Sequence, residues 1–95
     1  MITEIRATSD EQAGTVKLDF NTRCESIQKL ADALPVVNAY EEISFRGDGP
    51  KTLRMAGKYC QHAACPVPSG IIKAIEVASG LALPKDATIE VKKEE

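Results

Sequence analysis

The chain of 95 residues contains no tryptophan, and only 4% of its residues are aromatic. Charge of one sign is also lacking, because 12 Lys and Arg residues are offset by 14 Asp and Glu residues, for a net charge of −2. Proteins that bind nucleic acid usually present a basic surface with aromatic side chains among the basic ones. The composition therefore argues against nucleic acid as a partner.

Long apolar runs are missing as well. No stretch of about 18 apolar residues occurs, so we expect no membrane-spanning segment. The start of the sequence, Met1 to Arg6, lacks the basic and apolar regions of a secretory signal, which predicts a cytoplasmic location. With 43% hydrophobic and 27% charged residues, the sequence is typical of a single globular domain, expected to cover residues 1–95.

Cysteine and histidine are scarce but clustered. Of three cysteines and one histidine, Cys60, His62 and Cys65 fall within the segment Cys-Gln-His-Ala-Ala-Cys-Pro-Val-Pro. An odd number of cysteines argues against a full set of disulfides, and thiols in the cytosol stay reduced. The cluster therefore indicates metal binding or thiol chemistry.

Alternation of apolar and polar residues predicts strands at 2–8, 15–20 and 87–91, with the first two forming a hairpin. Residues 36–46 fit either a turn of helix or a short edge strand. We predict a small α+β domain in which a mainly antiparallel sheet of three strands, the N-terminal hairpin plus the C-terminal strand, carries about three helices on one face. The order of the strands is left open.

Local signals place the expected helix starts. Thr22 and Glu25 fit a capping box, in which the Thr22 hydroxyl accepts from the backbone N–H of Glu25. Pro50 suits the first position of a second helix, where its missing N–H costs nothing. A third helix is expected to begin near Pro66 or Ser69.

This arrangement puts each cysteine at a helix end: Cys24 at the start of the first helix, Cys60 at the end of the second and Cys65 at the start of the third. If these ends meet, His62 on the connecting loop supplies a fourth ligand, and three Cys with one His are a common zinc set. Three thiolates also suit an iron–sulfur cluster. We therefore predict that Cys24, Cys60, His62 and Cys65 bind zinc or an iron–sulfur cluster in a mainly structural or regulatory role.

Two alternatives remain open. Cys65 at a helix start is positioned as a reactive thiol, and it is the catalytic candidate if the protein transfers sulfur or thiol groups. Alternatively, the cysteines are small core residues of a metal-free module that binds an unknown protein partner. Carboxylate pairs with catalytic spacing are absent, and we interpret Glu41 and Glu42 as surface charge, so the sequence favours a protein that is not an enzyme. It does not indicate an oligomeric state.

The motif Cys65-Pro66-Val67-Pro68, which leads into an isoleucine-rich helix and then a strand, resembles the sulfur-carrier proteins of the TusA type. In those proteins the cysteine of a Cys-Pro-x-Pro motif carries a persulfide. The resemblance covers residues 65 to about 91 and implies persulfide chemistry at Cys65. The motif follows the first strand in those proteins, whereas it lies late in this chain.

A broader resemblance rests on Cys24 with Ile27-Gln28-Lys29-Leu30-Ala31, on the Cys-x-His-x-x-Cys-Pro-Val-Pro motif at 60–68, and on Gly80-Leu81-Ala82-Leu83-Pro84. From Asn21 onward the chain is similar to a family of small uncharacterised proteins from anaerobic bacteria and archaea. Members usually carry a further cysteine near the first hairpin, and residues 5–14 here have none. The resemblance implies the same site residues, with His62 in the fourth place, and an anaerobic setting.

Overall fold

The computed structural model describes residues 3–10, 12–60, 62, 65–84, 91 and 93. The described chain begins with the hairpin β1 (Thr3–Asp10) and β2 (Thr15–Thr22), followed by α1 (Glu25–Ala33), β3 (Val36–Asn38) and α2 (Ala39–Glu42). Helices α3 (Lys51–Tyr59) and α4 (Val67–Ala78) complete it. None of the described helices is long and apolar enough to cross a membrane.

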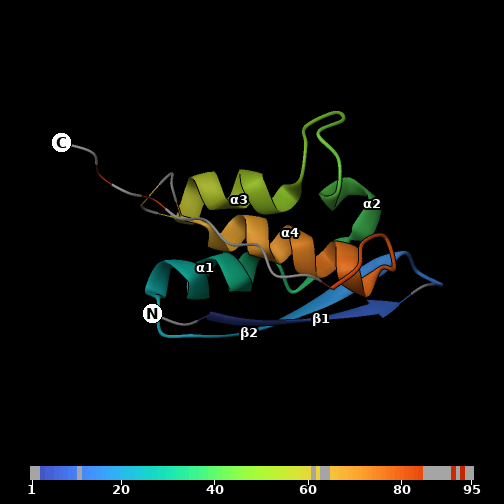
Figure 1. The fold of residues 1–95 in the computed structure, drawn as a ribbon, viewed down its shortest axis with the longest axis horizontal. Helices are drawn as coiled ribbons and strands as arrows, with labels where there is room; N and C mark the ends of the chain where they lie inside the picture. The colour runs from blue at the N-terminus through green and yellow to red at the C-terminus, as the bar shows by residue number, and fades with distance from the viewer. Residues whose placement is uncertain are drawn as a thin grey trace.

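The sheet has the order β1-β2-β3 and both strand pairs are antiparallel. Helices cover one face of it: α4 packs on β1, α1 packs on β2, and α3 lies on top of α1 and α4 (Figure 1). The α+β prediction with a three-stranded antiparallel sheet and helices on one face is confirmed. The third described strand is β3, which comes from the segment left ambiguous, while the strand expected at 87–91 falls almost wholly outside the described residues.

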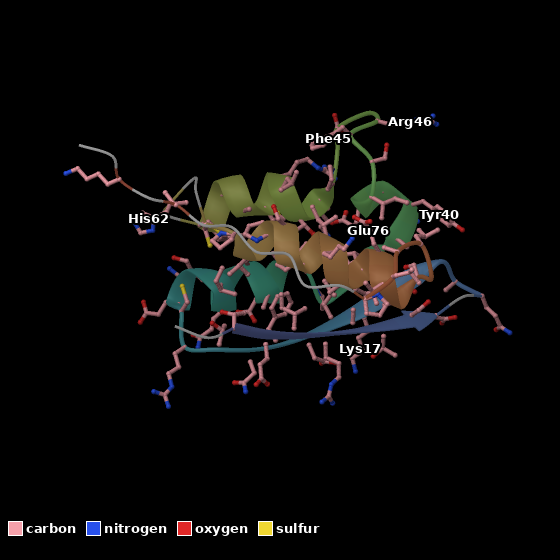
Figure 2. All side chains as sticks on the ribbon, viewed as in Figure 1. Lys17, Tyr40, Phe45, Arg46, His62 and Glu76 are labelled. Atoms are coloured by element: carbon pink, nitrogen blue, oxygen red, sulfur yellow. The ribbon has the colours of Figure 1, made fainter. Side chains whose placement is uncertain are left out.

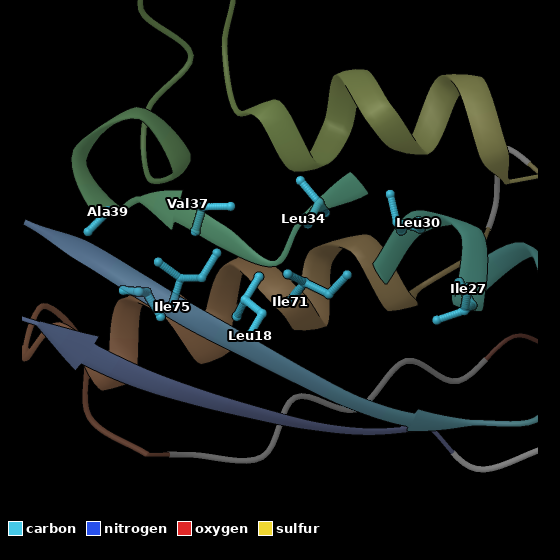
Figure 3. Packing of buried hydrophobic residues seen from close by; sticks show 9 residues of the cluster. Leu18, Ile27, Leu30, Leu34, Val37, Ala39, Ile71 and Ile75 are labelled. Carbon is cyan, nitrogen blue, oxygen red and sulfur yellow. The ribbon is translucent and has the colours of Figure 1, made fainter. Parts of the chain in front are cut away.

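The core lies between the sheet and the two inner helices (Figure 3). Its members are apolar and almost completely buried: Val16, Leu18, Ile27, Leu30, Leu34, Val37, Ala39, Ile71 and Ile75. Strand β2 contributes alternate residues, as one face of a strand must, and α1 contributes residues three or four positions apart. Ile71 and Ile75 are fully buried here, so they anchor α4, which packs on β1, in this core.

Helix α1 begins differently from the prediction. The capping box is wrong: Thr22 is the last residue of β2, and its hydroxyl accepts from the backbone N–H of Cys24 at 3.2 Å. The Thr22 hydroxyl also shares a 2.9 Å hydrogen bond with the hydroxyl of Thr3 on the paired strand. Cys24 is therefore the N-cap residue of α1, with an extended backbone and no side-chain cap.

Helix α3 is capped by a side chain from another helix. Pro50, its N-cap residue, makes no side-chain cap, and the carboxylate of Glu42 in α2 takes over this role. Glu42 accepts from the backbone N–H groups of Lys51 at 2.8 Å and Thr52 at 2.7 Å, and from the Thr52 hydroxyl. Glu42 is completely buried, so its interpretation as surface charge is wrong. The positive end of the α3 dipole stabilises the buried carboxylate.

Candidate functional site

Three helix ends meet at one end of the molecule. The N-terminal end of α1, the C-terminal end of α3 and the N-terminal end of α4 all lie on the left in Figure 1. Helices α3 and α4 run in opposite directions, so the end of α3 and the start of α4 both lie here. The exposed side chain of His62 lies here too (Figure 2). The sequence-based expectation that these helix ends converge therefore agrees with the fold.

Each cysteine is held by backbone hydrogen bonds. Cys24 is the N-cap residue of α1, and its carbonyl accepts from the N–H of Gln28 at 2.9 Å. Cys60 is the C-cap residue of α3, and its N–H donates to the carbonyl of Ala56 at 2.8 Å. All three cysteines are free, half-buried and packed against the core cluster. Their backbones are thus fixed by helix termini, while the side chains remain reachable.

Cys65 lies immediately before Pro66, the N-cap residue of α4. Its N–H donates to the carbonyl of His62 at 3.2 Å, which closes a tight turn. This turn directs the chain from α3 back into α4.

The three thiols influence one another. Burial raises the pKa of the Cys60 thiol above its ordinary value of 9.0, and the neighbouring thiols of Cys65 and then Cys24 raise that pKa further. A hydrogen bond with the side chain of Cys65 acts in the same direction, as expected when the Cys60 S–H is the donor. The fold therefore brings all three sulfurs within electrostatic range, with Cys60 and Cys65 in closest association.

This shift in pKa predicts a pH dependence of stability. The folded state holds the Cys60 proton more tightly than the unfolded chain does, so this contribution is complete below the unfolded pKa and is lost as the pH rises through the folded pKa. We expect the difference in free energy of unfolding between wild type and Cys60→Ala to decrease above about pH 9. Urea denaturation from about pH 7 to about pH 10.5 measures it. A constant difference over this range would contradict the raised pKa of the Cys60 thiol, to which burial contributes most.

A hollow adjoins two of the thiols. Its volume is about 470 Å³, and its described walls come from α3, the start of α4 and the cysteine and histidine residues between them. The lining residues are Leu53, Ala56, Gly57, Cys60, His62, Cys65, Pro68 and Ser69. A larger hollow of about 860 Å³ lies between β1 and α4, and no cysteine is among its described lining residues.

The sequence prediction missed the hollow, although Gly57 signals it. A glycine inside a helix costs about 1 kcal/mol relative to alanine, so an interior glycine calls for an explanation. Gly57 lies three residues before Cys60, which puts both on one side of α3. A Cβ atom on Gly57 would meet nothing within 4 Å, so the glycine borders open space.

Among the residues that the structure describes, no group of three or more His, Cys, Asp or Glu side chains is placed to hold a metal ion as it stands. The fold associates Cys60 and Cys65, brings Cys24 within electrostatic range, and leaves His62 exposed at the edge of the hollow. Cys24, Cys60 and Cys65 are all free thiols.

Comparison with known proteins gives a family but no activity. A family model matches residues 1–91, and its description is DUF6951, a family of unknown function. No curated protein and no solved structure matches the chain. The match agrees with the resemblance to a family of uncharacterised proteins, while the anaerobic setting and the likeness to TusA-type carriers stay predictions.

Proposed function

The chain belongs to this family of unknown function, and we propose from its geometry that Cys24, Cys60 and Cys65 bind a soft metal, either zinc or the iron of an iron–sulfur cluster. The observation that supports the proposal is that three free thiols stand at three helix ends that lie at one end of the molecule, with the pKa of Cys60 raised in part by the other two. Thiols that raise a neighbour's pKa repel one another as thiolates, and a bound cation converts this repulsion into attraction.

The free-energy cost of turning the three thiols toward one metal ion is small compared with the free energy that metal binding releases. A cysteine has a single side-chain torsion with three staggered positions, and a strained position costs about 0.5–1.5 kcal/mol. Structural zinc sites release about 10–16 kcal/mol at neutral pH. The free energy of metal binding therefore exceeds the cost of rotating the cysteine side chains toward an ion, even though these side chains are not grouped around one position in the metal-free structure.

His62 stands as a candidate fourth ligand with weaker support than the thiols. It lines the hollow beside Cys60 and Cys65, but its side chain is exposed. An exposed imidazole gives up side-chain freedom and hydration when it binds a metal. We propose that the three thiolates supply most of the affinity and that His62 contributes less.

Metal uptake tests the proposal. Protein purified without oxygen is incubated with Co²⁺, and separately with iron and sulfide, and the bound metal is measured by elemental analysis and visible absorption. We expect thiolate-to-metal absorption and one metal site per chain, with both lost in the variant that combines Cys60→Ser and Cys65→Ser. Folded wild-type protein that takes up neither cobalt nor a cluster would contradict metal binding.

A second candidate function, sulfur transfer through Cys65, is favoured by the position of Cys65, which lies immediately before the N-cap residue of α4 and lines the hollow with its side chain half-buried. A Cys65 thiolate can attack the outer sulfur of a persulfide donor R–S–SH, which forms Cys65–S–SH and releases R–S⁻. Intact-mass analysis after incubation with such a donor would then show one added sulfur that is absent in Cys65→Ser. Equal gains in wild type and Cys65→Ser would exclude this role.

A further inference from the structure

Two aromatic side chains are exposed in one region of the surface. The chain has two Tyr, two Phe and no Trp, and of these Tyr40 is 70% and Phe45 is 81% exposed. Tyr40 belongs to α2, and Phe45 and Arg46 lie on the loop between α2 and α3, residues 43–50, which rises above both helices in Figure 2. Aromatic and arginine side chains are enriched at protein interfaces, so this α2–α3 loop is a candidate contact surface.

The α2–α3 loop is ordered by its own hydrogen bonds. The N–H of Arg46 donates to the Ser44 hydroxyl, and the N–H of Gly49 donates to the carbonyl of Arg46, both at 3.1 Å. Gly49 has a φ of 76°, in the left-handed region that favours glycine. The ring of Phe45 lies against Gly49, since its Cδ1 atom is 3.7 Å from the place that a Cβ of this glycine would take. Phe45 is thus presented on a defined turn, which reduces the entropy lost on binding.

A hollow of about 350 Å³ lies beside this turn, with walls from α2, the α2–α3 loop and α3. Gly49, against which Phe45 lies, is part of the wall, and so is Tyr40. Phe45 itself is not among the lining residues. A projecting aromatic side chain and a hollow that can receive one therefore stand next to each other on the same surface.

The charges around this hollow balance. Its charged lining residues are Glu41, Arg46, Asp48 and Arg54, so two positive and two negative groups give a formal net charge of zero. Within the described part of the chain, none of these four side chains forms an ion pair. A partner of one charge sign would be attracted by one pair and repelled by the other. A second copy of the chain carries the same balanced set and can place each charge opposite one of the other sign.

We propose that the α2–α3 loop and the hollow beside it form the contact of a homodimer with two-fold symmetry, in which Phe45 of each copy enters the hollow of the other. A two-fold contact uses the same surface on both copies, so this surface must complement itself in shape and charge. An enclosed aromatic side chain buries about 150–250 Å², and the symmetry doubles this gain. The contact lies at the start of α3, whereas Cys60 lies at its end, so the thiols of both copies stay outside the dimer contact.

Sedimentation velocity at protein concentrations from about 5 μM to about 500 μM tests the dimer. Wild type is expected to change from monomer to dimer as its concentration rises, and Phe45→Ala to dimerise at least about tenfold more weakly. Leu83→Ala is the matched control, because Leu83 is 85% exposed but does not line the hollow, and it should dimerise as wild type does. A wild type that stays monomeric, or a dimer that Phe45→Ala leaves unchanged, would overturn the proposal.

Exchange of the charges tests the same surface independently of Phe45. Arg46→Glu leaves one arginine with three acidic residues, a formal charge of −2, and Asp48→Arg leaves three arginines with one acidic residue, a charge of +2. At low salt each variant alone is expected to dimerise at least about tenfold more weakly than wild type, because like charges then meet. An equimolar mixture should form the heterodimer, which native mass spectrometry identifies by its mass. A mixture that associates no better than its two components would contradict this contact.

Discussion

Replacing Glu42 by alanine is expected to lower the free energy of unfolding by about 3–5 kcal/mol. The carboxylate is fully buried and accepts three hydrogen bonds, from the N–H groups of Lys51 and Thr52 and from the Thr52 hydroxyl. Each buried donor that loses its partner costs about 1–3 kcal/mol. Since domains of this kind are stable by only about 5–15 kcal/mol, the loss is a large fraction of the total.

The neighbouring residue provides the control. Glu41 has an exposed side chain on the same short helix, so Glu41→Ala is expected to change stability by no more than about 0.5 kcal/mol. Glu42→Gln, which keeps an acceptor oxygen but adds an N–H₂ group facing donors, should fall between the two. Urea denaturation midpoints at unchanged slope measure all three variants. A Glu42→Ala protein as stable as Glu41→Ala would disprove the capping role.

Zinc is expected to stabilise the folded protein by about 4 kcal/mol when its concentration is a thousandfold above the dissociation constant. The reason is that the thiols stand at the ends of α1, α3 and α4, which separate when the chain unfolds. Mutating a residue that hydrogen-bonds to a metal ligand typically lowers metal affinity by about 10–100-fold. Cys24→Ser removes a proposed ligand itself, so it is expected to weaken zinc binding by at least about 100-fold. At the same zinc concentration, stabilisation would then fall to about 1.4 kcal/mol.

His62→Ala is the comparison for this measurement. We expect it to weaken zinc binding by no more than about tenfold, so that the same zinc concentration still stabilises the variant by about 2.7 kcal/mol. Thermal or urea unfolding of both variants, with and without zinc, separates the contributions of thiolate and imidazole. If Cys24→Ser retained the full zinc effect, Cys24 would not be a ligand, and a site formed by Cys60, Cys65 and His62 would replace the one proposed.

The sequence predicted those helices and strands in which apolar residues recur at a regular spacing. Alternation in β2 and the helical spacing of Ile71 and Ile75 in α4 reflect burial on one face, and the structure buries those residues. The position of Cys24, Cys60 and Cys65 at helix ends was predictable for a similar reason, because each residue adjoins a recognisable helix boundary.

The predictions from the sequence were wrong where a residue distant in the chain changes the structure or burial that the local sequence favours. Thr22 and Glu25 match a capping box, but pairing of Thr22 with Thr3 extends β2 and moves the start of α1 by two residues. Glu42 looks like surface charge because its sequence neighbours are polar. Its burial depends on the N-terminus of α3, nine residues further along, and the sequence contains no pattern that connects the two.

The separation of the thiols along the chain has a consequence for how the protein matures in the cell. Cys24 leaves the ribosome first, and with synthesis at about 5–20 residues per second several seconds pass before Cys65 follows. Cys60 and Cys65 flank the ends of α3 and α4, whereas Cys24 belongs to α1, which packs on β2 and α3. A chain that ends before Cys65 would therefore lack one of the three thiols of the proposed metal site.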